Sequence, residues 1–175
     1  MQWLMTNWYL IHTKDGCEEK IHKNLTGKKI QSYVPINRTT NRENDKKVSE
    51  PLFPNLVFVK TTPEKFTKIR RIRGVRHFLY WISSPVCIKN EDLEILKEFV
   101  ESHQEITVDK CMVNIERPFE SLNFPIITRA NDIVTIQNTI TKLYLPALGY
   151  ILTVIHEHQP LEFGKRSMER AFSAS

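Results

Sequence analysis

The sequence predicts an α+β fold in two parts, an N-terminal sandwich of strands and helices followed by a small β-barrel. Up to residue 103, segments whose apolar residues have the spacing of a strand alternate with segments whose apolar residues have the spacing of a helix. Beyond it, short β-branched runs are separated by turn residues, which is typical of a small all-β barrel. We expect a domain at 1–103, a linker at 104–110, a barrel at 111–158 and a polar tail at 159–175.

The first part is predicted to have the order β-α-β-β-α-β-α. The run 52–59 is apolar throughout, as in a strand buried on both faces at the centre of a sheet. Asp15 and Glu18 have the spacing of a capping box, and Gly74 is placed to end the second helix. Polar residues 37–49 predict an exposed hairpin tip. The predicted strands are 8–13, 30–36, 52–59 and 75–82, and the helices are 15–28, 62–72 and one that Asn90 caps.

The second part is predicted to contain five short strands and no helix. Its β-branched runs lie at 112–115, 126–128, 133–136, 142–145 and 150–155. The tail after residue 158 is polar and is expected to be poorly ordered.

Basic residues are concentrated in the N-terminal half. Residues 12–77 contain 16 Lys and Arg against 7 Asp and Glu, whereas the whole chain has a net charge of +5. This asymmetry indicates a surface that meets nucleic acid. The alternative is a solvated basic face without a partner.

Several classes of protein are disfavoured by what the sequence lacks. The N-terminus has no apolar signal segment, and the apolar stretch 143–155 is too short and interrupted to span a membrane, so we expect a cytoplasmic protein. Cys17, Cys87 and Cys111 form no C-x-x-C pair. His156 and His158 lack a third ligand, and Cys17 lacks an orienting acid. We therefore predict no metal, no cofactor and no catalytic site.

Three segments of the N-terminal half resemble the N-terminal (NGN) domain of the NusG family of transcription factors. They are Trp8-Tyr-Leu-Ile-His-Thr, Glu50-Pro-Leu-Phe-Pro-Asn-Leu-Val-Phe-Val and Arg73-Gly-Val-Arg-His-Phe followed by Ser84-Pro85. Within the family, the run from Val48 to Asn55 resembles RfaH, and Asn55-Leu-Val-Phe-Val resembles the UpxY group. The resemblance implies a transcription elongation and antitermination factor that acts on a restricted set of operons.

The second part resembles the SH3-like KOW barrel of the same family. The segment from Val113 to Asn123 matches its pattern except that Arg117 and Ser121 replace glycines. The resemblance implies ribosomal protein S10 as a partner of the barrel. Refolding of this part into helices, which the likeness to RfaH raises, is opposed by Pro118, Pro125 and Pro146.

The resemblance also implies that the first domain binds RNA polymerase. An apolar depression on this domain is implied to receive the clamp helices of the β′ subunit. The residues that match this depression, or lie beside it, are Phe53, Leu56, Phe58, Phe78 and Trp81. A few aromatic and aliphatic anchors of this kind supply most of the affinity of an interface. The alternative is that Phe58 and Phe78 are core residues.

A basic set in the same domain is implied to contact the non-template DNA strand of the transcription bubble. Lys14 and Arg73 match family positions on that surface. Phosphates are attracted by such a groove, and arginines can stack on unpaired bases. The set consists of Lys14, Lys20, Arg70, Arg71, Arg73 and Arg76. We expect a monomer that suppresses pausing without catalysing a reaction.

The competing function is a sequence-specific nucleic-acid regulator that works without polymerase. Nine acidic residues against three basic ones in 91–120 oppose it, because an acidic linker and barrel entrance repel phosphate.

Overall fold

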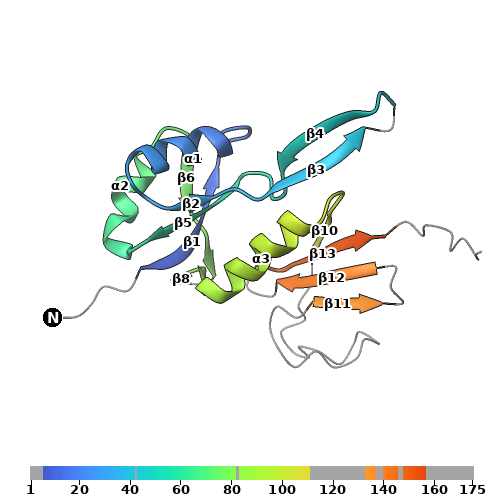
Figure 1. The fold of residues 1–175 in the computed structure, drawn as a ribbon. Helices are drawn as coiled ribbons and strands as arrows, with labels where there is room; N and C mark the ends of the chain where they lie inside the picture. The colour runs from blue at the N-terminus through green and yellow to red at the C-terminus, as the bar shows by residue number, and fades with distance from the viewer. Residues whose placement is uncertain are drawn as a thin grey trace, which may run out of the picture.

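The computed structural model describes residues 6–41, 43–81, 83–110, 133–136, 140–145 and 148–156. These residues form a central sheet with helices, a projecting ribbon and a second sheet beside the last helix (Figure 1). The helical elements are α1 (Glu18–Gly27), a 3-10 turn η1 (Pro63–Lys65), α2 (Phe66–Arg70) and α3 (Asn90–Ser102). The predicted α+β class is confirmed.

Five strands make the central sheet, and β1 (Asn7–Thr13) is its middle strand. The order is β2-β5-β1-β6, with β9 continuing the line of β6 along the same side of β1. β1 pairs antiparallel with β5 from Asn7↔Thr61 to His12↔Leu56. The other members are β2 (Ser32–Tyr33), β5 (Leu56–Thr61), β6 (Val75–Phe78) and β9 (Cys87–Ile88).

Alternation along β1 divides the core between the two faces of the sheet. Tyr9 and Ile11 join the residues of α1 and α2 on one face. Trp8 and Leu10 join the apolar side of α3 on the other. β5 is buried at five of its six positions, as predicted for a central strand.

The polar residues predicted as a hairpin tip are mostly strand. β3 (Ile36–Asn41) and β4 (Lys46–Pro51) pair over their whole length and project from the domain (Figure 1). The ribbon is fixed at its base by the buried side chain of Asn37. Its Nδ2 donates to the Ile106 carbonyl at 2.9 Å, and its Oδ1 accepts from the Ile106 amide at 3.0 Å. A second, short ribbon consists of β7 (Tyr80–Trp81) and β8 (Ser84–Pro85).

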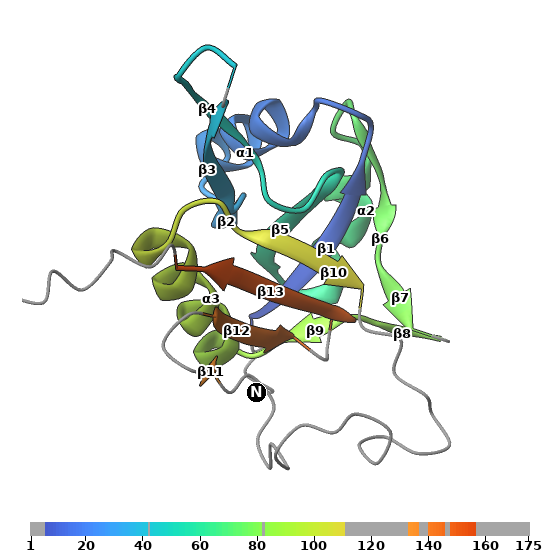
Figure 2. The same ribbon diagram turned by 90° about the vertical axis from the view of Figure 1, so that its right-hand side faces the viewer.

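A four-stranded sheet of order β10-β13-β12-β11 packs on the α3 side of the first domain (Figure 2). Leu143, Leu145, Leu152 and Val154 of this sheet are buried in one cluster with Leu10 and Phe58. Its strands are β10 (Thr107–Lys110), β11 (Ile133–Ile136), β12 (Ile140–Leu145) and β13 (Tyr150–Ile155). The predicted strands 112–115 and 126–128 and the tail lie outside the described residues, so the closed barrel stays a prediction.

Several local predictions are wrong. Asn90 does not cap the last helix, because it is the first residue of α3 and Lys89 is the N-cap, without a side-chain hydrogen bond. Residues 107–110 of the predicted linker are strand β10, because they pair with β13 from Thr107↔Thr153 to Lys110↔Tyr150. The predicted capping box does not form, since α1 begins at Glu18 without a side-chain cap. Glu18 Oε1 instead accepts a hydrogen bond from the Asn55 amide at 2.7 Å, so the carboxylate holds the approach to β5.

Candidate functional site

The end of β1 and the start of β6 bring two of the predicted basic segments together. Thr13 pairs with Val75 after a register shift in β1, and the Lys14 amide donates to the Gly74 carbonyl at 2.8 Å. Lys14 and Arg73 are therefore neighbours across this junction, although they are far apart in the sequence.

Gly74 allows α1 to lie against this junction. Its φ is +102°, a conformation that side chains rarely adopt. A Cβ here would lie 3.2 Å from the Cys17 Cβ and 3.3 Å from the Ile21 Cδ1. The glycine therefore serves the packing of α1 beside the start of β6. It does not end the second helix as predicted, because α2 ends at Arg70 with Arg71 as its C-cap.

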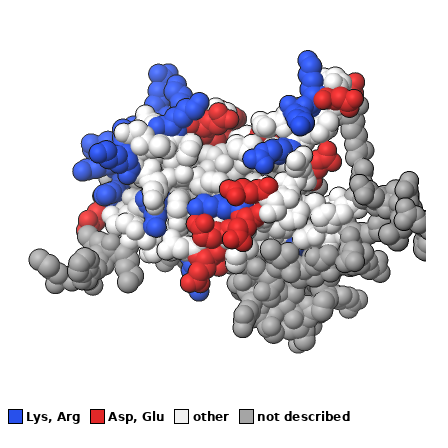
Figure 3. Space-filling view, viewed as in Figure 1, with Lys and Arg blue, Asp and Glu red and all other residues white. Residues whose placement is uncertain are grey.

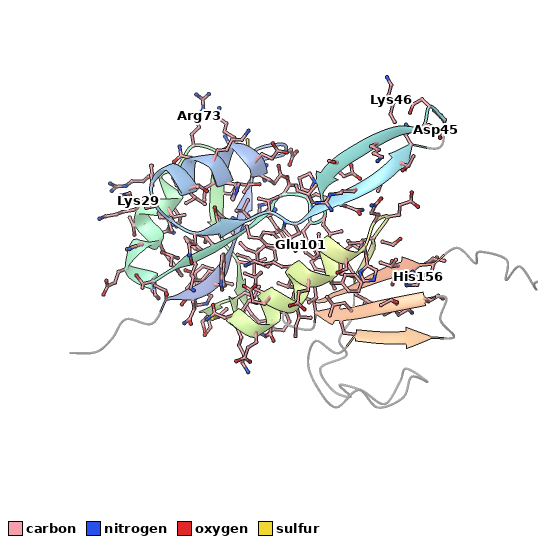
Figure 4. All side chains as sticks on the ribbon, in the orientation of Figure 1. Lys29, Asp45, Lys46, Arg73, Glu101 and His156 are labelled. Carbon is pink, nitrogen blue, oxygen red and sulfur yellow. The ribbon has the colours of Figure 1, made fainter. Side chains whose placement is uncertain are left out.

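All six predicted basic residues are exposed. Lysines and arginines gather over the part of the molecule formed by α1 and α2, and Arg73 lies at its upper edge (Figures 3 and 4). Within the described part of the chain, none of the six has a carboxylate within 4 Å. Unpaired cations on one surface attract phosphate from a distance, and this attraction weakens with salt. We call this set, Lys14, Lys20, Arg70, Arg71, Arg73 and Arg76, the basic surface.

A histidine pair beside the basic surface was missed by the sequence analysis. His12 and His77 pair across β1 and β6, with stacked rings whose centroids are 5.2 Å apart. Burial lowers the pKa of His12, and the neighbouring His77 and Arg76 lower it further, against the opposite influence of Asp15. The buried His12 Nδ1 has no hydrogen-bond partner among the described residues. Only the strand register, which the sequence does not state, places these rings together.

Three residues of the predicted apolar depression are buried in the structure. Phe53, Leu56 and Phe58 are 2%, 6% and 0% exposed and lie in the cluster that contains the C-terminal strands. Phe53 contacts Tyr150 of β13, with ring centroids 5.3 Å apart. A partner could reach the Phe53 ring on this side only after Tyr150 of the C-terminal sheet had moved away.

The other two predicted polymerase contacts lie elsewhere. Phe78 pairs with Ile11, whereas Phe58 pairs with Leu10, so the two phenylalanines face opposite sides of the sheet. Phe78 is 1% exposed and stacks on Phe66 of α2 at 3.8 Å between ring centroids. Trp81 is 65% exposed on the β7–β8 ribbon.

Among the described residues, no group of three His, Cys, Asp or Glu side chains is placed to bind a metal ion. In the same part of the chain, no helix is long and apolar enough to cross a membrane.

Residues 6–97 match the model of the family described as transcription termination factor NusG. The match covers more than half of the chain and includes β1, the basic surface and most of α3. The chain belongs to the NusG family. Members of this family are transcription factors rather than enzymes, which confirms the prediction that the chain is not an enzyme.

Individual relatives agree with this assignment. The transcription termination/antitermination protein NusG of Halalkalibacterium halodurans is 33% identical over 86 residues, which cover 42% of this chain and 48% of that protein. The chain thus matches about half the length of this relative.

Two solved structures are also similar. One, described as the domain interaction in Thermotoga maritima NusG, has a TM-score of 0.47 at 17% identity and covers 86% of this chain and 93% of its own. The other, an MjSpt4:Spt5 complex, has a TM-score of 0.31 at 14% identity, with coverage of 85% and 99%.

Proposed function

We propose that this protein is a transcription elongation and antitermination factor that binds RNA polymerase and the exposed non-template DNA strand together. The observation that carries the proposal is the basic surface, in which Lys14 and Arg73 meet at Gly74 within a domain of the NusG family. By bridging the polymerase clamp and the DNA, the protein would keep the clamp closed and suppress pausing.

The polymerase contact is proposed to be the face formed by Phe53, Leu56 and Phe58, with Trp81 as a neighbouring anchor. Its apolar and aromatic character suits the clamp helices of the β′ subunit. Because Tyr150 of the C-terminal sheet contacts Phe53, and other residues of that sheet are buried in the same cluster, we expect the clamp to compete with that sheet. The apparent affinity is then the intrinsic affinity reduced by the fraction of molecules in which the face is open.

The finer parts of the proposal rest on the sequence resemblance. We propose a restricted set of operons, because the run from Val48 to Asn55 resembles RfaH, and S10 as a partner of the barrel, because 113–123 resembles a KOW segment. The protein would work as a cytoplasmic monomer.

Polymerase-independent regulation is the second candidate, supported by the basic surface alone. The acidic residues of α3 make it unfavourable for nucleic acid to extend from the basic surface across this helix. Five acidic residues lie on that helix against Lys97, and they are visible as a cluster in Figure 3. They separate the basic surface from the C-terminal sheet.

Co-purification of bacterial RNA polymerase core enzyme with the tagged full chain tests the proposal. We expect Trp81→Ala to weaken retention of polymerase without altering stability, since the side chain is 65% exposed. Ile155→Ala is the matched control, because Ile155 is equally apolar and 68% exposed but lies on β13.

The double variant Arg71→Glu/Arg73→Glu tests the DNA contact in the same experiment. It should retain polymerase and lose binding to single-stranded DNA. Failure of the unaltered chain to retain polymerase would refute the elongation-factor proposal and favour the independent regulator.

A further inference from the structure

An open pocket of about 640 Å³ lies between the helix α1 and the acidic helix α3. It is lined by Trp8 of β1, by Ser32 of β2, and by residues of α1, the turn that follows it, β5 and α3. Three lysines, Lys29, Lys60 and Lys97, line it against one acid, Glu94. The lining therefore has a net charge of about +2 at neutral pH.

Two of the lysines lie close to the indole, and in the residues that the structure describes only one of their two positive charges is paired with a carboxylate. The Lys60 and Lys97 ammonium groups lie 5.9 and 5.5 Å from the Trp8 ring centroid. Lys97 pairs with Glu94 at 2.7 Å, whereas Lys60, which is half-buried, has no carboxylate within 4 Å among the described residues. A partly desolvated cation without a counter-charge is costly unless an anion binds beside it.

Lys29 is held in the pocket wall by an unusual backbone. α1 ends in a Schellman motif, in which the Ile30 amide donates to Leu25 and the Lys29 amide to Thr26. The residue after the cap in this motif is usually glycine, but here it is Lys29, with φ of +57°. Strain kept at a side chain that lines a pocket points to a function for that side chain.

Neutral donors complete the lining. The Ser32 hydroxyl and His22 Nδ1 are 2.8 Å apart, and the Asn90 side chain lies at the start of α3. Lysines and hydroxyl groups together are typical phosphate contacts. A terminal phosphate carries 1.5 to 2 negative charges at about pH 7, which matches the surplus charge of the lining better than a single carboxylate would.

We propose that this pocket binds the terminal phosphate of a nucleotide, with Lys29 and Lys60 as its counter-ions. The nucleotide is either free or the 5′ end of a nucleic-acid strand, since both present the same group. The site is separate from the basic surface and goes beyond the proposed function. Its test needs no polymerase, so the two ideas can fail independently.

Trp8 provides a direct readout in the full-length chain. In a Trp3→Phe/Trp81→Phe background, Trp8 is the remaining tryptophan, and its emission depends on the ammonium groups above its ring. The probes are ATP, inorganic phosphate, and one single-stranded oligonucleotide prepared with and without a 5′-phosphate. We expect a saturable change in emission with a phosphate-bearing probe.

Two variants and a matched control separate a binding role from a structural one. Lys60→Gln and Lys29→Gly should each weaken binding about tenfold. Lys29→Gly should do so without loss of thermal stability, because glycine relieves the strained φ. Lys28→Gln should leave binding unchanged, since Lys28 is equally exposed at the same helix end but does not line the pocket.

The result also identifies the source of the phosphate. A response to ATP or inorganic phosphate assigns the pocket to free nucleotides, and a response only to the 5′-phosphorylated oligonucleotide assigns it to a strand end. The proposal is overturned if no probe gives a saturable change, or if the oligonucleotide binds equally with and without its phosphate. Equal weakening by Lys28→Gln and Lys29→Gly would overturn it too.

Discussion

Replacing Asn37 by leucine should disconnect the base of the β3–β4 ribbon from the segment that leads into the C-terminal sheet. Asn37 is 8% exposed, and its amide makes both hydrogen bonds to the backbone of Ile106, at 2.9 and 3.0 Å. Leucine has a similar volume but no polar atoms. The buried N–H and C=O of Ile106 would both lose their partner.

The cost follows from those two groups. A buried donor or acceptor left without a partner costs about 1–3 kcal/mol, so two of them predict a loss of about 2–6 kcal/mol in the free energy of unfolding. Urea denaturation monitored by circular dichroism would measure it as a lower midpoint. Hydrogen exchange of the Ile106 amide should accelerate in parallel, since that amide would no longer be protected.

The same strand offers a control. Asn41 also uses its side chain to accept a backbone hydrogen bond, from Glu43 at 2.9 Å, but it is exposed. Asn41→Leu should change stability by less than about 0.5 kcal/mol. The reasoning is refuted if Asn37→Leu and Asn41→Leu have the same stability, or if the Ile106 amide keeps its native exchange rate in Asn37→Leu.

Three other predictions follow from the core and the strand pairing. Because the pKa of His12 is lowered in the folded chain, the unfolded chain binds a proton more readily, and stability should decrease as the pH falls below 6.5. In His12→Gln the midpoint of urea denaturation should depend less on pH between about pH 8 and pH 5.5. Burial, followed by the charge of Glu101, raises the pKa of Tyr33 to about 12. The stability that the neutral Tyr33 phenol contributes is therefore present below pH 10 and is lost as the pH rises toward 12. An ultraviolet difference titration should show this late-titrating phenol in the unaltered chain and not in Tyr33→Phe. Gly74→Ala should lower the free energy of unfolding by about 1–3 kcal/mol and weaken single-stranded DNA binding, because alanine disfavours a φ of +102° and its Cβ would press on Cys17. In Gly27→Ala the new Cβ meets nothing within 4 Å, so a thermal melt should show unchanged or higher stability.

The sequence was sufficient for the fold class and for the elements of the first domain. Apolar periodicity located β1, β5 and α3 to within a few residues, because each of these elements buries a continuous side or both faces. Apolar periodicity did not predict segments that become strands only through pairing with a distant part of the chain. Residues 107–110 have few apolar side chains, and they form a strand only because β13 pairs with them.

The candidate site was predictable in part. The basic residues were found because charge and family motif agree at Lys14 and Arg73. The covering of Phe53 by Tyr150 could not be predicted, because the packing of one part on another leaves no periodic pattern in either. Phe78 shows a different limit, since its face depends on the register of β6 against β1, and that register shifts between His12 and Thr13.

The position of β1 has a consequence for synthesis of the protein on the ribosome. β1 is made before its partners, and it is hydrogen-bonded on both sides, to β5 and to β6 and β9. Its last partner, Ile88, pairs with Trp8 and follows it by 80 residues. Once β5 has emerged and paired with one edge of β1, the other edge at Trp8 and Tyr9 stays unpaired until Cys87 and Ile88 have left the exit tunnel, at about 5–20 residues per second. Translational pausing before residue 88 would prolong the exposure of this strand, and with it the opportunity for aggregation.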